Sequence, residues 1–284
     1  MKFLAVSKTS FTKILTGIMI LTGLIFTGCN VNNNDGNKGK FRVSLTDAPG
    51  DYAAVNIEVK QILIKTSDDS DDDSESDMVD EEGSWKVIFD DSMVVNLLDY
   101  QNGTTLFLGE TELETGIYEE MRLVLGDNNS IVLNNGSSVN LTVPSAQTSG
   151  YKIKLNTEVE PDQVTDLVID FDAARSIVVR GNGDFNLKPV LRVVEVDDAG
   201  SISGTIGQSD ADAWVYTVAG EDTVSTMPNE SGEFTLYGLE AGTYDVTIDS
   251  QTEVYVDSTI YDIELDTNEH FEFENTILLD TLSR

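Results

Sequence analysis

The chain has 284 residues, and its 17 Lys and Arg stand against 51 Asp and Glu, which gives a formal charge of −34. A field of this sign repels phosphate backbones, so we expect no nucleic acid partner. A single cysteine and a single histidine exclude a disulfide framework and catalysis by a Ser/His or Cys/His pair.

The first 28 residues have the pattern of a lipoprotein signal peptide. Lys2, Lys8 and Lys13 accompany an apolar run over residues 14–26, which is too short for a comfortable membrane span. The run ends in "IFTGC", which resembles a bacterial lipobox, whose Cys29 would be acylated as the first residue of the mature protein. The pattern predicts attachment to membrane lipid through Cys29. A free, buried cysteine after an uncleaved leader is the alternative.

Residues 29–39 are polar and rich in Asn and Gly, which predicts a flexible tether. Loss of the leader removes three lysines and no acid, so the mature chain has 14 cationic side chains against 51 acids, a charge of −37. Asn30 stands after Cys29 where Asp would favour the inner membrane. We therefore expect the outer membrane of a bacterial cell envelope, with the periplasmic or surface face left open.

Alternation of apolar and polar residues dominates the rest of the chain. The segment "YKIKLNTEV" over residues 151–159 and the segment "FEFENTILL" over residues 271–279 both place apolar side chains on one face. Breakers such as "GDNNS", "NNGSS" and "GNGD" separate such runs at about 8 to 12 residues. The length and spacing predict an all-β chain of two antiparallel β-sandwich domains in tandem, with one short helical turn at "NLLDYQNG".

Six segments between residues 41 and 196 resemble one family. In chain order they read "VSLTDAPGDY", "NLLDYQNG", "LETGIYEEMRLVL", "LTVPSAQTSGYKI", "IDFDAARSIVV" and "NLKPVLRVVEV". This region is similar to the bacterial DUF4382 domains, which are typical of secreted lipoproteins and have no established biochemical role. The resemblance implies a domain over residues 40–197.

A second resemblance covers residues 201–279. The region is similar to the carboxypeptidase regulatory-like, prealbumin-like domains, which are seven-stranded sandwiches among the carbohydrate-binding-like folds. The matching signature consists of Ser231, Gly232, Phe234, Gly238, Leu239, Gly242 and Tyr244. The resemblance implies a second sandwich domain over residues 199–284.

The phrase Leu-Glu-x-Gly-x-Tyr occurs once in each region, and we interpret it as a sandwich corner. In each copy the leucine would anchor the corner in the core, the glycine would adopt a positive φ, and the tyrosine would tie the corner through its hydroxyl. The residues are Leu113, Gly116 and Tyr118 in the first copy and Leu239, Gly242 and Tyr244 in the second.

Asp170 and Asp172 alternate with apolar residues, so both carboxylates should project from one face of a strand, about 7 Å apart. Pairing with Arg175, Lys188 or Arg192 would make them structural. A weak calcium site or an acid/base pair is the alternative, because hard cations and proton transfer both need paired carboxylates. Asp47 is expected to bond its own turn.

Three further features have both a structural and a functional interpretation. Ten acids within residues 68–82 predict a disordered loop, and an EF-hand register there fails because Ser76 replaces the required Gly. His270, Glu272 and Glu274 share one face and could hold zinc, although a lone His is more often inert. Five aromatic residues could stack on sugars or pack in the core: Trp214, Tyr216, Tyr237, Tyr255 and Tyr261.

These features predict a non-catalytic, membrane-anchored cell-envelope lipoprotein that acts as a binding, structural or adhesion module. No cofactor is predicted. Carbohydrate or another envelope protein is the expected partner, with weak divalent cation binding as an addition. The alternatives are a carbohydrate-binding accessory lipoprotein and, third, a hydrolase that uses two carboxylates.

Overall fold

A computed structural model describes residues 37–48, 50–66, 85–144, 150–181, 183–220 and 222–282. The predicted signal peptide, Cys29 and the acidic segment 68–82 lie outside these residues. All described residues belong to one compact unit, Asp35–Arg284. None of their helices is long and apolar enough to cross a membrane.

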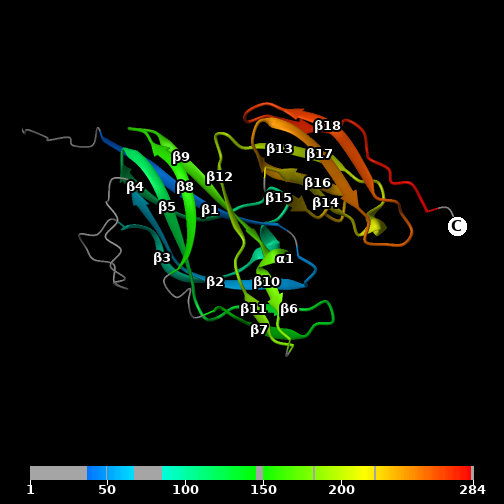
Figure 1. Cartoon of the computed structure of the whole chain (residues 1–284), viewed down its shortest axis with the longest axis horizontal. Helices are drawn as coiled ribbons and strands as arrows, with labels where there is room; N and C mark the ends of the chain where they lie inside the picture. Colours follow the sequence, from blue (N-terminus) through cyan, green and yellow to red (C-terminus); the bar gives the residue numbers. More distant parts are fainter. Residues whose placement is uncertain are drawn as a thin grey trace, which may run out of the picture. The chain divides into compact units, whose positions relative to one another are not determined.

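The all-β prediction is confirmed, because almost every element of the described chain is a strand (Figure 1). The first sandwich has two sheets. Sheet I has the order β12-β9-β1-β4, with β1 (Lys38–Ala48), β4 (Leu106–Glu114), β9 (Val164–Asp172) and β12 (Leu191–Glu195). Sheet II has the order β10-β11-β7-β6-β2-β5-β8, and β3 also pairs with β2. Its strands are β2 (Ala54–Thr66), β3 (Trp85–Asn96), β5 (Gly116–Leu125), β6 (Ser130–Val132), β7 (Ser138–Thr142), β8 (Tyr151–Val159), β10 (Ile177–Val179) and β11 (Phe185–Leu187).

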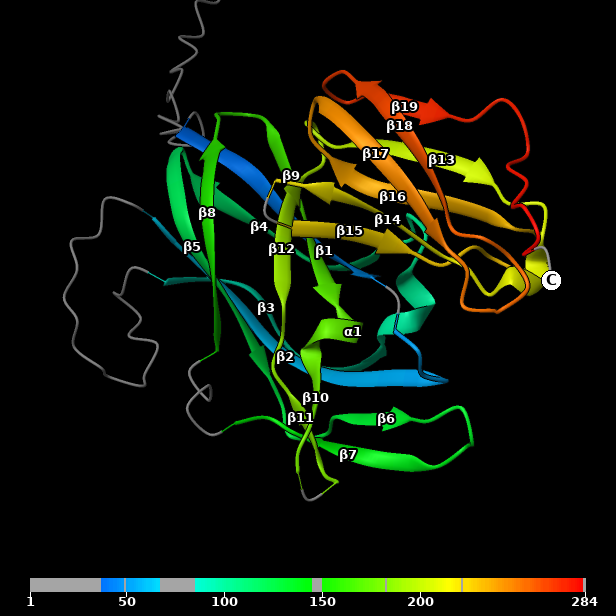
Figure 2. The ribbon, with the colours of Figure 1, turned by 45° about the vertical axis from the view of Figure 1, so that its right-hand side comes forward.

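The second sandwich has seven strands in two sheets, which can be followed in Figure 2. Sheet III has the order β16-β13-β19, with β13 (Gly200–Thr205), β16 (Glu233–Leu239) and β19 (His270–Glu272). Sheet IV has the order β15-β14-β17-β18, with β14 (Trp214–Ala219), β15 (Asp222–Thr226), β17 (Gly242–Asp249) and β18 (Ser258–Leu265).

Most strand pairs are antiparallel, as predicted, but three are parallel: β1 with β9, β7 with β11, and β13 with β19. A parallel pair needs a long crossover connection. In each of these three pairs, the chain between the two strands forms other strands of the same sandwich, so the connection is long enough for a crossover. The alternation of apolar and polar residues does not distinguish the two directions.

Each sandwich has its own hydrophobic core, and the two cores share no residue. The first core includes Phe41, whose ring lies 6.4 Å from the ring of Tyr118. The second includes Phe234 and Leu236 between sheets III and IV. Burial of the apolar face of each alternating strand therefore explains why the two sheets of each sandwich pack together. The predicted boundary at residues 197–199 falls between the cores, while contacts join the two sandwiches into one unit.

Among the described residues, helical structure is limited to single turns. The turn predicted at "NLLDYQNG" is the 3₁₀ helix η2 (Leu97–Tyr100). The sequence did not predict the helix α1 (Ala173–Ser176) or the 3₁₀ helix η4 (Ser209–Ala211). An element of four residues or fewer makes about one turn, which is too short to show a helical periodicity of apolar residues. The predicted strand over residues 271–279 is wrong in length. It ends at Glu272, and Ile277 forms only an isolated bridge with Ile206.

Candidate functional site

The outer edge of β16 is bound by side chains of the first sandwich. β16 is the last strand of sheet III, so one side of its backbone has no neighbouring strand within the described structure. Asn102 lies in the turn after η2, and its Nδ2 donates to the carbonyl of Glu233 at 3.0 Å. Its Oδ1 accepts from the backbone N–H of Thr235. One amide thus reproduces both bonds of a strand neighbour and covers an edge that would otherwise be open to other strands.

Arg192 of β12 makes a second attachment to the same edge. Its Nη1 donates to the carbonyl of Gly238 at 2.6 Å and its Nη2 to the carbonyl of Tyr237 at 3.3 Å. The same Nη2 lies 2.7 Å from Oδ2 of Asp170. Both charged side chains are largely buried, with exposed fractions of 19% and 13%. Asp170 therefore holds the guanidinium in place while it binds β16.

Asp172 caps the short helix α1. Its Oδ1 accepts from the backbone N–H of Arg175 at 2.7 Å, and its Oδ2 accepts from the guanidinium of the same residue. The expected pairing of Asp170 and Asp172 with arginines is therefore what the structure shows. Within the described ranges, no three His, Cys, Asp or Glu side chains are placed to hold one metal ion. Calcium binding at these two residues stays a prediction.

Asp47 is buried at the end of β1, beside these two carboxylates. The sequence suggested that Asp47 would bond its own turn, but its hydrogen bonds in the described structure have other partners. Its Oδ1 accepts from the N–H of Ala173 at 3.1 Å and its Oδ2 from Nε2 of Gln101 at 3.0 Å. Burial raises the pKa of Asp47 well above its ordinary value, against the lowering effect of these two hydrogen bonds. Asp47 thus links β1 to α1 and to the turn that carries Asn102.

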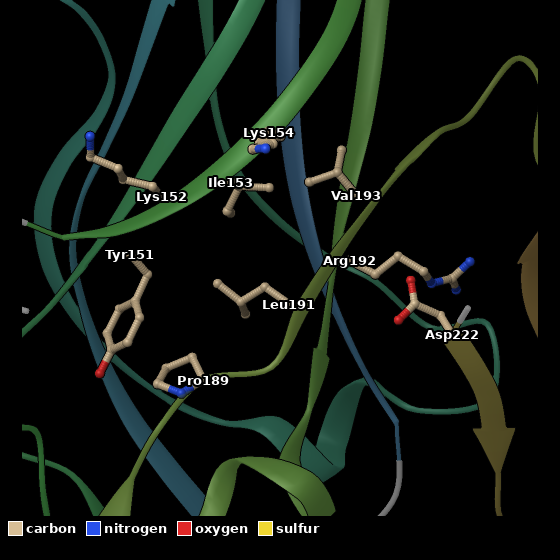
Figure 3. A pocket seen from close by; sticks show the side chains of 9 residues that line it. All are labelled: Tyr151, Lys152, Ile153, Lys154, Pro189, Leu191, Arg192, Val193 and Asp222. Carbon is tan, nitrogen blue, oxygen red and sulfur yellow. The ribbon is translucent and has the colours of Figure 1, made fainter. Parts of the chain in front are cut away.

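A groove follows the edges of β8 and β12. One part, of about 790 Å³, is lined by both strands and by the β14–β15 and β16–β17 turns. A second part, of about 420 Å³, continues it toward Tyr151 and shares Lys154, Arg192, Val193 and Asp222 with the first. Figure 3 shows Ile153, Leu191 and Val193 between the two strands, with Arg192 and Asp222 together at one side. The groove has an apolar floor and charged walls.

The two repeated phrases form matching corners. The hydroxyl of Tyr118 donates to the carbonyl of Glu114 at 3.0 Å, and that of Tyr244 donates to the carbonyl of Glu240 at 2.8 Å. Leu113 and Leu239 are buried. Desolvation raises the pKa of Tyr118 to about 12, so this hydroxyl stays a donor at physiological pH. The interpretation as a tied corner holds in both copies.

The prediction for the two corner glycines is right only in the first copy. Gly116 has a φ of +150°, whereas Gly242 does not have a positive φ. In the second copy the positive φ, +76°, lies at Gly238. A Cβ at Gly238 would come within 2.8 Å of Val194, so this glycine also permits the close approach of β12.

The predicted aromatic residues divide into separate groups. Trp214 and Tyr216 lie on the face of β14 opposite the buried Val215, half-buried rather than inside the core. Their cross-strand neighbours include Asp249 and Thr247 of β17. Tyr255 packs against the second core, and Tyr261 is exposed.

His270 lies on β19 and shares a hydrogen bond of 2.9 Å between its Nδ1 and the hydroxyl of Ser201. Glu272 is on the same short strand, while Glu274 lies beyond its end. The structure therefore does not arrange the predicted zinc set as three neighbours on one strand.

Sequence reasoning missed Asn102 as an edge-binding residue. The pair Asn102-Gly103 has φ values of +60° and +79°, so an Asn-Gly turn could have been read from the sequence. Its role depends on a strand 131 residues away, and no local pattern indicates that distance.

The fold and these contacts define the class: an all-β protein of two sandwiches joined through a covered strand edge. The chain belongs to the family described as domain of unknown function DUF4382, whose model matches residues 38–189. No curated protein matches the chain.

Three solved structures share only low similarity with the chain. The Bacillus anthracis TIE protein is 12% identical, with a TM-score of 0.23. The match covers 86% of this chain and 34% of the TIE protein, so this chain spans about a third of the length of the TIE protein. The minor pilin GBS52 of Streptococcus agalactiae is 9% identical, with a TM-score of 0.23 and coverage of 86% and 97%. The shaft pilin SpaA of Lactobacillus rhamnosus GG is 8% identical, with a TM-score of 0.23 and coverage of 86% and 99%.

Proposed function

We propose that this protein is a non-catalytic, lipid-anchored lipoprotein of the bacterial cell envelope whose two sandwiches act as one rigid binding or structural module. The observation that carries the proposal is the double attachment of β16 by Asn102 and Arg192. A flexible pair of domains would leave this edge open, whereas an attached pair presents fixed surfaces to a partner.

The non-catalytic part of the proposal is supported by the state of the two carboxylates that the sequence offers for acid/base work. Asp170 binds the guanidinium of Arg192, and Asp172 binds Arg175 and caps α1. Charge-assisted bonds of this kind fix the position of a carboxylate and occupy its oxygens, which leaves them less open to a substrate. Both residues therefore suit a structural role better than proton transfer.

The anchor is supported by the leader pattern that ends at Cys29. A multiply acylated cysteine would give stable membrane attachment, because each buried methylene contributes about 0.8 kcal/mol. In the native host, Cys29→Ser is expected to release the protein from the membrane fraction or to block its processing, whereas Asn33→Ser should behave as the wild type. Intact mass spectrometry that finds an unmodified Cys29 in the membrane-bound protein would overturn the anchor.

A carbohydrate partner is the second candidate, and the outer face of sheet IV favours it. Trp214 and Tyr216 lie two residues apart on β14, next to the hydroxyl of Thr247 and the carboxylate of Asp249. Aromatic faces flanked by polar groups suit sugar rings. The seven strands also agree with the resemblance to the carboxypeptidase regulatory-like domains.

A glycan array tests this candidate directly. We expect Trp214→Ala to abolish binding of any glycan that the wild type retains. Trp85→Ala is the matched control, because Trp85 is the other tryptophan of the chain and lies in the first sandwich. Equal losses in the two variants, or no bound glycan at all, would rule out a sugar site on sheet IV.

A further inference from the structure

The free edge of β8 carries two lysines in a chain that is otherwise strongly acidic. β8 is the last strand of sheet II, and among the described strands it pairs only with β5. Lys152 and Lys154 are exposed and lie two residues apart, so they project from the same face at a spacing of roughly 7 Å. They are two of the 14 cationic side chains left after Cys29 becomes the first residue.

The same chain shows what such a cationic row binds elsewhere. On β1, Lys38, Lys40 and Arg42 alternate along one face. The neighbouring strand β4 places acids opposite each of them, and the ion pairs include Lys40 with Glu110 at 3.2 Å and Arg42 with Glu110 at 2.7 Å. Hydrogen bonding to Arg42 lowers the pKa of Glu110. A cationic row on one strand is thus matched by an acidic row on the next.

The two lysines of β8 have an acidic partner only on the side of β5. Glu120 of β5 lies 3.6 Å from Nζ of Lys152 and also 3.2 Å from Nε of Arg122, so one carboxylate is shared by two cations. Within the described part of the chain, Lys154 makes no hydrogen bond or ion pair that would neutralise it. On the second side of the row, along the free edge, no strand of the described chain is paired with β8.

Between Tyr151 and Leu155 the groove gives this edge room for another strand, whereas Glu195 of β12 contacts the edge at Thr157. Its two parts are lined by β8 from Tyr151 to Thr157, and they meet at Lys154. Its floor beside β8 is formed by Ile153, Leu191 and Val193 (Figure 3). A strand paired with β8 would place alternate side chains on the lysine face and the remaining ones over this apolar floor.

We propose that the free edge of β8 binds an extended segment of a partner protein by strand addition, and that this segment alternates acidic with apolar residues. The backbone of β8 supplies the hydrogen bonds, Lys152 and Lys154 select the acids, and the groove accepts the apolar side chains. Asp222 lines the other side of the groove, which disfavours the partner's acids there, and Glu195 of β12 is already engaged by the hydroxyl of Thr157 at the end of the edge. The inference gives the proposed binding role a partner and rests on that role, but it does not depend on the lipid anchor.

The test uses a fluorescent seven-residue peptide of alternating Glu and Val and the purified full-length protein, with binding followed by anisotropy. Lys152→Glu combined with Lys154→Glu is expected to weaken binding by at least about tenfold, since two favourable charge pairs become repulsive. Lys60→Glu combined with Arg180→Glu changes the charge equally at exposed positions away from β8 and should leave binding unchanged. Thermal unfolding checks that both variants fold.

Two peptides methylated on alternate backbone nitrogens test strand addition itself. An added strand directs every second N–H toward β8, so methylation of one set should abolish binding and methylation of the other should not. Unchanged binding of both peptides would overturn strand addition. A polyuronate that competes as well as the peptide at equal carboxylate concentration would show that the face recognises charge alone and would also overturn it.

A second copy of this chain is the remaining occupant to exclude. Sedimentation of the protein without peptide should show monomers. If the protein forms oligomers, and these disappear when Lys152 and Lys154 are changed to Glu, then the occupant of the β8 edge is a second copy of this chain and not a partner protein. Release of the Cys29→Ser variant from membranes is independent of all these measurements, so failure of the anchor and failure of the β8 site can be told apart.

Discussion

At the scale of single residues, two tyrosines close equivalent corners in the two sandwiches. Each ring is buried and each hydroxyl donates to a carbonyl four residues earlier, Tyr118 to Glu114 and Tyr244 to Glu240. The bond therefore fixes the entry of β5 and of β17 by the same geometry. Because a buried hydroxyl must find an acceptor, the sequence already indicated this role.

Removal of either hydroxyl should destabilise the protein to a similar extent. Tyr118→Phe and Tyr244→Phe each lose one hydrogen bond and leave a carbonyl without that partner, which costs about 1 kcal/mol of unfolding free energy. Urea unfolding measures the change, and Tyr261→Phe, at a tyrosine that is 66% exposed, is the control. An effect confined to one of the two corners would show that they are not equivalent.

Asp47 makes a pH-dependent contribution of known sign. Its folded-state pKa lies above the unfolded value of about 3.9 because the carboxyl is buried. The stability it contributes is therefore fully present below about pH 3.9 and is lost as the pH rises through the folded-state pKa. Each unit of pKa difference corresponds to about 1.4 kcal/mol.

Asp47→Asn should remove this loss. We expect the free energy of unfolding of the variant, relative to the wild type, to increase between pH 4 and pH 7 in urea titrations. The asparagine can still accept from the N–H of Ala173, so the link to α1 is retained. Asp91→Asn, at an exposed acid, controls for the change in net charge. A constant difference between Asp47→Asn and the wild type would contradict the raised pKa.

At the scale of elements, strand edges explain how the sandwiches are joined. The edge of β16 is covered by Asn102 and Arg192, while the edge of β8 faces a groove. Asn102 holds a left-handed φ of +60°, which Asn adopts more readily than most residues. Its side chain is thereby directed at the backbone of a strand from the other sandwich.

Asn102→Ala should loosen this attachment. The loss of its three side-chain hydrogen bonds, the third from the hydroxyl of Thr226 at 3.5 Å, and the left-handed φ together should cost about 1 to 3 kcal/mol. Asn268→Ala is a matched control, because Asn268 also has a positive φ, +56°, in an exposed turn. Hydrogen exchange should show faster exchange of the Thr235 N–H in Asn102→Ala alone. Equal exchange in the two variants would mean that Asn102 does not protect β16.

The sequence predicted the strands better than their partners. Alternation identified β8 and the buried faces of both sandwiches, since burial of one face imposes a period of two. The sequence predicted Asp170 and Asp172 on one strand with arginines as candidate partners, and in the structure they pair with Arg192 and Arg175. The parallel pairing of β1 with β9 and the binding of Asn102 to β16 were not readable, because both depend on residues more than 100 positions apart in the chain.

At the scale of the whole molecule, the expected division into residues 40–197 and 199–284 can be tested by separate expression. Each piece contains one complete core, so we expect both to give β-rich circular dichroism and a cooperative melt. The second piece should melt at a lower temperature than the full chain and associate at high concentration, because the edge of β16 loses its cover. A soluble but unfolded second piece would place the boundary elsewhere.

The charge of −34 makes the folded state sensitive to ions. Self-repulsion is partly relieved on unfolding, so potassium chloride should raise the melting temperature by screening. Because Asp170 and Asp172 already bind guanidinium groups, we expect calcium to raise it no more than potassium chloride at matched ionic strength. Differential scanning calorimetry at about 10 mM calcium makes the comparison.

A specific calcium site would be visible in this experiment. A site with a dissociation constant of about 1 mM would add about 1.4 kcal/mol at 10 mM calcium, or roughly 3 to 6 °C in melting temperature. If such an excess were found, Asp170→Asn with Asp172→Asn would test whether calcium displaces the two arginines. Retention of the excess in that variant, and its loss on deletion of residues 68–82, would place the calcium on the acidic segment and leave Asp170 and Asp172 with their structural role.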